Sequence, residues 1–161
     1  MSIACTTAGF GRRIGALVYD WFLLAGVLMI AQFMLVAAIA GLAYGGWIDL
    51  APYGGEVSRY LVGKRLATLW LLFWIVGFYS FFWCYAGQTL GMKAWRLRVQ
   101  NSDGSKLRTT QGIVRALSAL LGFGNLMVLF SRPQRAWQDL VADCEVVVLP
   151  KAAKKPSGPA A

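Results

Sequence analysis

Two long apolar blocks constrain this chain more than any other feature of its sequence. Residues 66–85 contain no charged side chain, and residues 14–44 are interrupted only by Asp20 and Gln32 among apolar neighbours. About 20 apolar residues suffice for a helix to cross the hydrocarbon core of a bilayer. We therefore predict two transmembrane helices, the first of them long enough to tilt or to project beyond the bilayer.

A third apolar region, residues 111–130, differs from these two because it contains Arg115 and is broken by the sequence GFGN at residues 122–125. Each half is about 10 residues long, which is too short to span alone. We predict that residues 111–138 form a re-entrant or interfacial helical hairpin with its apex at the GFGN break. Non-helical backbone at this depth is tolerated where protein covers it. The alternative is a third crossing, which would place the C-terminus on the opposite side.

The net charge of +9 comes with only 14% charged and 58% hydrophobic residues. Excess lysine and arginine can mark a nucleic-acid-binding protein, but in a membrane protein it marks the loops that face the cytoplasm. The apolar blocks favour the second interpretation, so we expect the lipid bilayer, and no nucleic acid, as a partner. Basic residues precede the first block, fill residues 87–112 and recur near the end. This distribution predicts an inner-membrane protein with both termini in the cytoplasm.

A small β-element is predicted outside the membrane. Residues 94–100 alternate between apolar and polar side chains, which is the pattern of a strand with one buried face, and residues 144–149 form a short β-branched run. We expect these two strands to pair, and we predict a returning strand at residues 106–109 after a turn at residues 101–104. The predicted fold class is an all-α membrane protein with two full transmembrane helices, the hairpin, and this cytoplasmic β-element.

The sequence lacks the residues from which most enzyme sites are built. It contains no histidine, which is the commonest general base and metal ligand. Its three cysteines, Cys5, Cys84 and Cys144, are far apart and form no metal-binding or redox motif. We therefore predict no cofactor, no metal site and no enzymatic activity.

The charged residues within the apolar regions are the candidate functional residues. Arg13 and Asp20 lie seven residues apart, about 10 Å along one helix face. A carboxylate at membrane depth costs up to about 3 kcal/mol and needs a partner, and Arg115 is the partner we expect. The pair is either an ion or proton site, or a structural link between the first span and the hairpin. Asp139 is expected to form salt bridges at the cytoplasmic interface.

Three segments in this order resemble the RDD family of membrane proteins: AGFGRRIGALVYD (8–20), GQTLGMKAWRLRV (87–99) and RAWQDLVADCEVVV (135–148). The family is named for an arginine and two aspartates, which correspond here to Arg13, Asp20 and Asp139, with Arg12 as an alternative for the arginine. The resemblance implies one membrane domain over residues 8–149, and residues 150–161 have the composition of a disordered basic tail. The family often has histidine where this chain has Gln138.

The resemblance also implies a class of function. Transport has been proposed for such proteins, and some are associated with cation/proton antiport, so we expect exchange of a small ion or solute. Two spans cannot enclose a pathway alone, which predicts a homo-oligomer. The alternative is a non-transporting scaffold or accessory subunit that binds a protein partner through its basic cytoplasmic face.

Overall fold

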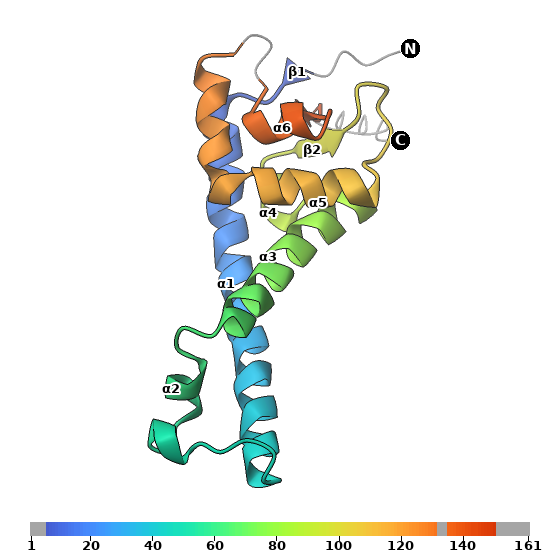
Figure 1. Cartoon of the computed structure of the whole chain (residues 1–161). Helices are drawn as coiled ribbons and strands as arrows, with labels where there is room; N and C mark the ends of the chain where they lie inside the picture. Colours follow the sequence, from blue (N-terminus) through green and yellow to red (C-terminus); the bar gives the residue numbers. More distant parts are fainter. Residues whose placement is uncertain (1–5, 132–134, 151–161) are drawn as a thin grey trace, which may run out of the picture.

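Two long helices dominate the computed structural model, which describes residues 6–131 and 135–150 (Figure 1). Helix α1 (Phe10–Tyr44) and helix α3 (Arg65–Tyr85) are both long and apolar enough to cross a membrane. Their apolar side chains point outward: Phe22 is 78% exposed and Phe33 is 74% exposed. An apolar surface of this extent is stable in lipid and not in water. The prediction of two membrane-length helices is confirmed.

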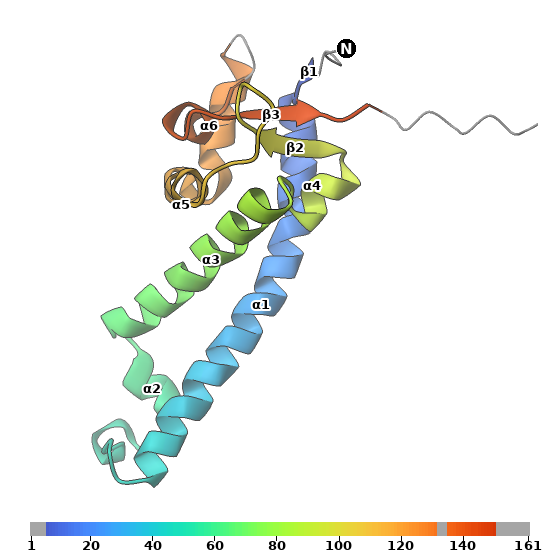
Figure 2. The ribbon, with the colours of Figure 1, turned by 90° about the vertical axis from the view of Figure 1, so that its right-hand side faces the viewer.

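The two helices are joined at one end by a short 3₁₀ turn, η1 (Ala51–Tyr53), and by helix α2 (Val57–Leu61). A small apolar cluster holds this end together and is formed by Leu35, Ile39 and Leu61. Near it, the Trp70 indole donates a hydrogen bond of 3.0 Å to the Ala31 carbonyl oxygen. Figure 2 shows α1 and α3 diverging toward this end, with α2 between them.

Within the described residues, the strands lie at the other end, around the first turns of α1 (Figure 2). Helix α4 (Leu90–Ala94) leads into β2 (Leu97–Gln100), which pairs antiparallel with β3 (Glu145–Val148). The predicted pairing of the two strands is confirmed. A third strand, β1 (Thr6–Thr7), pairs with the opposite edge of β3 and gives the order β1-β3-β2. Its two threonines are too short a run for sequence patterns to reveal.

The predicted returning strand at residues 106–109 is wrong. Asn101 closes the turn by donating its side-chain amide to Ser105 Oγ and to the Lys106 carbonyl oxygen. Leu107 is then buried in the core, and Thr109 already begins the next helix. The edge of β2 that does not pair with β3 is instead covered by the segment before it, since Val99 N donates to the Gly87 carbonyl oxygen.

The hairpin region consists of helix α5 (Thr109–Ser118), the 3₁₀ segment η2 (Leu120–Leu129) and helix α6 (Trp137–Val141). Helix α5 lies across the end of α3, and η2 turns to run beside α1 (Figure 1). The break falls at Ala119, so the predicted apex at GFGN is wrong. Gly124 serves close packing instead, because a Cβ there would stand 2.1 Å from Gln138 Oε1.

The core lies between the sheet and the ends of the two long helices. Leu97, Val99, Cys144 and Val146 fill it from the strands, and Trp83 reaches it from α3. Because β1 pairs with β3, the first and last described elements lie at the same end of α1. Most of the predicted basic tail, residues 151–161, lies outside the described residues.

Candidate functional site

A cluster of buried charges lies where α1 meets the sheet end of the molecule. Seven α1 residues are buried, at spacings of three, four or seven that place them on one helix face, and Arg13 and Asp20 are among them. Arg12, the neighbour of Arg13, is exposed. The buried arginine of the first turn is therefore Arg13, and the burial resolves which of the two belongs to the cluster.

Asp139 is the centre of this cluster and is fully buried, with 0% of its surface exposed. Its Oδ2 atom lies 2.6 Å from Arg13 Nη1, and its Oδ1 atom lies 2.9 Å from Arg115 Nη2. It also accepts a hydrogen bond from the backbone nitrogen of Ala136, at the start of α6. One carboxylate therefore joins α1, α5 and α6.

The protonation state of Asp139 follows from these contacts. Burial alone would raise the pKa of its carboxyl group, because a low-dielectric interior disfavours the charge. The positive charges of Arg115 and Arg13, and the hydrogen bonds they donate, outweigh burial and hold the pKa below its usual range. Asp139 is therefore ionised at neutral pH. The predicted salt bridges of Asp139 are confirmed.

Arg115 has a second partner besides this carboxylate. Its guanidinium lies 4.0 Å from the centroid of the Trp83 indole ring, in a cation–π geometry. Trp83 in turn stacks on Tyr79 one turn earlier in α3, with ring centroids 5.1 Å apart. Because a guanidinium is planar and weakly hydrated, it suits a site that is stacked on one side and ion-paired on another. Helix α3 is thereby added to the elements that the cluster joins.

Asp20 is held by different groups. Its Oδ2 atom accepts a 2.5 Å hydrogen bond from the Thr89 hydroxyl, and its Oδ1 atom accepts a 2.9 Å bond from the backbone nitrogen of Gly91. Thr89 Oγ1 also accepts from the Met92 nitrogen and so caps α4. A Cβ at Gly91 would lie 2.2 Å from the Ala16 carbonyl oxygen, so only glycine allows α4 to approach this closely.

The predicted pairing of Asp20 with Arg115 is therefore wrong. Among residues 6–131 and 135–150, the ion pairs of Arg115 go to Asp139, and Asp20 forms no ion pair within 4 Å. The expectation followed from the two apolar runs that contain Asp20 and Arg115. It could not anticipate that α6 places a second carboxylate between Arg13 and Arg115.

A cavity of about 60 Å³ lies beside Asp20 and the two buried arginines. Arg13, Asp20 and Arg115 all line it, together with Asn125 of η2 and apolar side chains. A polar cavity needs only about 10–15 Å³ of accessible volume for each water molecule. The space beside Asp20 is therefore large enough for several water molecules.

Next to the cavity, Gln138 and Asn125 form a buried amide pair. Gln138 Nε2 donates to Asn125 Oδ1 at 2.9 Å, and Gln138 Oε1 has no hydrogen-bond partner among the described residues. Among those residues, no group of three potential metal ligands comes together. Thr89, Trp83 and Gln138 are site residues that sequence reasoning did not assign. The only signal for Thr89 was its place in the GQTLG segment.

The comparison with known families decides the identity of the fold. The model of the RDD family matches residues 7–143. The chain belongs to the RDD family. No curated protein and no solved structure matches it. Arg13 and Asp139 are bonded directly to each other, whereas Asp20 occupies a separate site seven residues further along α1.

Membership in the RDD family and the exposed apolar helices together make this a membrane protein. Arg13 and Asp20 belong to α1 and Asp139 belongs to α6, and these two elements lie near opposite ends of the sequence. Folding of the RDD domain therefore requires nearly its whole length, because Arg13 and Asp139 are 126 residues apart.

Proposed function

We propose that this RDD protein is a subunit of a homo-oligomeric exchanger that moves a small cation against protons, with Asp20 as the group that carries the proton or the cation. The observation that supports this function most strongly is the contrast between Asp20 and Asp139. Both carboxylates are buried near the same end of α1, but their partners differ in charge.

Asp139 is unsuited to carry anything across a membrane. Two arginines neutralise it and hold it ionised, so neither a proton nor a metal cation can displace them cheaply. Asp20 is held by a hydroxyl and a backbone amide, which are neutral donors. A carboxylate with neutral donors, beside a cavity that charged side chains help to line, can exchange a proton for a cation without breaking an ion pair.

The walls of the cavity also favour a carrier at Asp20. Arg13 and Arg115 line it, and Asp139 compensates one of their two positive charges. Asp20 is then the group whose ionisation changes the net charge of the side chains around the cavity. Ionisable groups at membrane depth characteristically mark ion pathways and proton relays.

A pathway requires more than one copy of the chain, because two spans cannot enclose a polar route through lipid. We propose that copies assemble with their basic ends in the cytoplasm of a bacterial-type inner membrane. The arginines and lysines of residues 93–108 support this orientation, since short loops rich in basic residues remain on the cytoplasmic side.

Transport by purified protein in liposomes tests the proposal. The liposomes would contain a pH-sensitive dye, and gradients of Na⁺, K⁺ or Li⁺ would be imposed across the membrane. We expect proton movement that follows one of these gradients and that disappears in Asp20→Asn, which preserves the shape of the side chain. Asp49→Asn is the matched control, because Asp49 is exposed in the loop after α1, and this variant should transport normally.

Two outcomes would contradict this function. Unchanged flux in Asp20→Asn would exclude Asp20 as the carrier. Absence of flux in the wild type, with folded protein verified by circular dichroism and gel filtration, would favour a second function.

That second function is a non-transporting scaffold that binds a partner protein through the basic face of residues 87–110. Its specific support is the exposure of four basic side chains on this face, namely Lys93, Arg96, Lys106 and Arg108. Exposed charges of one sign steer a partner of the opposite charge. Recovery of one stoichiometric partner after mild solubilisation, and its loss when these four residues are changed to glutamine, would support the scaffold.

A further inference from the structure

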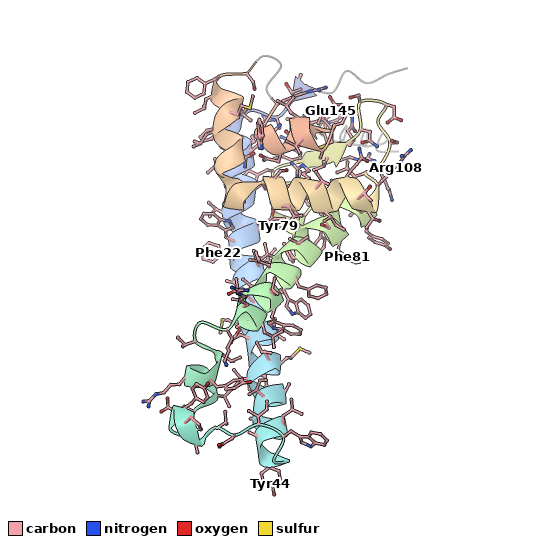
Figure 3. All side chains as sticks on the ribbon, viewed as in Figure 1. Phe22, Tyr44, Tyr79, Phe81, Arg108 and Glu145 are labelled. Atoms are coloured by element: carbon pink, nitrogen blue, oxygen red, sulfur yellow. The ribbon has the colours of Figure 1, made fainter. Side chains whose placement is uncertain are left out.

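An apolar groove of about 600 Å³ lies between α3 and α5, on the opposite flank of α3 from the charge cluster. Side chains of α3, among them Phe73, Val76 and Phe81, form one wall, and Ile113 of α5 contributes the other. Figure 3 shows Phe81 on the flank of α3 below α5. The volume is in the range of pockets that enclose whole ligands, and the surface chemistry is that of a hydrocarbon site.

The position of α5 fixes the depth of this groove relative to a bilayer. Its exposed face is apolar and consists of Ile113, Val114 and Leu117, whereas Thr109 and Thr110 at its first turn are exposed polar residues. A short amphipathic helix of this kind lies in the interface, with its apolar face at the acyl boundary. The groove beneath α5 is therefore at the depth of acyl chains, and the start of α5 is at the depth of headgroups.

Two basic side chains stand at the headgroup end of the groove. Lys106 Nζ donates a 2.9 Å hydrogen bond to the carbonyl oxygen of Tyr85, and Tyr85 itself lines the groove. Arg108 precedes α5 and projects outward from its start (Figure 3). Two carboxylates, Asp103 and Asp143, share the adjoining polar hollow with them, and Asp103 accepts a hydrogen bond from the Ser105 nitrogen.

We propose that this groove binds an anionic phospholipid, with one acyl chain between α3 and α5 and the phosphate at Lys106 and Arg108. The two halves of the site match the two halves of the ligand: hydrocarbon walls below α5 and cationic donors above it. The site is separate from Asp20 and its cavity, so it stands whether or not the protein exchanges ions.

A second copy of the chain fits this groove less well. Helices associate in membranes through small residues that allow their backbones to approach. The small residues of this region are already used within the chain, because a Cβ at Gly112 of α5 would lie 2.5 Å from Cys84 Sγ and 3.5 Å from the Ser80 backbone. What remains open beside these residues is a groove that the side chains of α3 and α5 line but do not fill.

Native mass spectrometry of the full-length protein tests the proposal, because it counts lipids and protein copies in one spectrum. The protein would be released from detergent after equilibration with equal amounts of phosphatidylglycerol and phosphatidylcholine. We expect retention of one phosphatidylglycerol per chain. Lys106→Gln and Arg108→Gln should each weaken retention about fivefold, since one basic residue near the membrane surface contributes about 1 kcal/mol.

A groove-filling variant provides the second arm. Gly77 lines the groove, and a Cβ there meets no atom within 4 Å, so Gly77→Leu fits without strain and occupies the space of the acyl chain. Gly26→Leu is the matched control, because Gly26 has the same open surroundings on α1. Arg59→Gln is the control for charge, since Arg59 lies in α2 at the other end of the molecule.

The expected result is that Gly77→Leu loses the retained lipid while Gly26→Leu and Arg59→Gln keep it. Equal retention of phosphatidylcholine, or retention unaffected by all three site variants, would overturn the proposal. Dimers without bound lipid that dissociate in Gly77→Leu would overturn it in favour of a second copy in the groove.

Discussion

The guanidinium of Arg115 lies between the indole ring of Trp83 and the carboxylate of Asp139, 4.0 Å from the ring centroid and 2.9 Å from the nearest carboxylate oxygen. Trp83 belongs to a membrane-length helix, whereas Asp139 belongs to a short helix near the end of the chain. A single side chain therefore connects a membrane-length helix to the end of the molecule that contains the sheet and α6.

The adjacent arginines of α1 provide a test of the buried charge cluster. Arg13 is paired with Asp139, whereas Arg12 is exposed. Arg13→Met should lower the free energy of unfolding by about 3–5 kcal/mol, because it breaks a buried ion pair and removes the guanidinium that donates to Asp139 Oδ2. Arg12→Met should change it by less than about 0.5 kcal/mol. Unfolding in detergent micelles, followed by tryptophan fluorescence, measures both changes. An effect of Arg13→Met as small as that of Arg12→Met would show that the cluster is unimportant for stability.

Asp139 predicts how stability depends on pH. Its pKa is lower in the folded protein than in the unfolded chain, so its ionised form stabilises the fold. This contribution is complete above the unfolded-state pKa of about 4 and is lost as the pH falls through the lower, folded-state pKa. The melting temperature of the wild type should therefore fall as the pH is lowered below about 4.

Asp139→Asn should melt lower than the wild type at neutral pH, because its two arginines lose their charged partner. It should also show a flatter dependence on pH, since it lacks the group that titrates. Thermal melts from neutral to strongly acidic pH would measure both effects. Parallel curves for wild type and variant would assign the acid sensitivity to another carboxylate.

Gly91 predicts a steric requirement at the contact between α1 and α4. A Cβ at this position would meet the Ala16 carbonyl oxygen at 2.2 Å and Asp20 Oδ1 at 2.8 Å. Gly91→Ala should therefore push α4 away from α1 and destabilise the protein by about 1–3 kcal/mol. Gly26→Ala, in open surroundings on α1, should instead stabilise it by about 0.5–1 kcal/mol. An unchanged free energy of unfolding in Gly91→Ala would mean that α4 does not pack against α1 as described.

Thr89 predicts a functional effect that is separable from its role in capping. Thr89→Ser keeps the hydroxyl that donates to Asp20 and accepts from the Met92 nitrogen, whereas Thr89→Val removes both bonds. We expect Thr89→Val to lose about 1–3 kcal/mol of stability and, under the proposed exchange function, to shift the pH dependence of transport, because Asp20 loses one of its two neutral hydrogen-bond donors. Thr89→Ser should resemble the wild type. Flux measured over a pH series distinguishes these results from simple unfolding.

Much of the fold could be predicted because the relevant patterns are local. The uncharged run of residues 66–85 and the alternation at residues 94–100 reveal a span and a strand without reference to the rest of the chain. The apex of the hairpin could not be located in this way. Glycine is as common at close contacts as at turns, and Gly124 proved to face Gln138.

The sequence singled out the charged residues of this cluster, but it revealed neither their connections nor the uncharged residues beside them. Arg13, Asp20, Arg115 and Asp139 all lie in one region, yet the sequence suggested the pair Asp20–Arg115 where the structure has Asp139 between two arginines. Burial of a charge can be expected from a hydrophobic context, but its partner depends on tertiary distances. The role of Thr89 depends in the same way on how α4 meets α1.

The ion pair between Arg13 and Asp139 constrains how the chain folds during its synthesis. Chains are made from the N-terminus at a limited rate, so Arg13 enters the membrane region long before Asp139, 126 residues later, exists. Until synthesis is nearly complete, Arg13 and Arg115 have no carboxylate from α6 to neutralise them. A chain truncated before α6 would keep Arg13 and Arg115 near the membrane without the Asp139 carboxylate, so this ion pair can form only in a nearly complete chain.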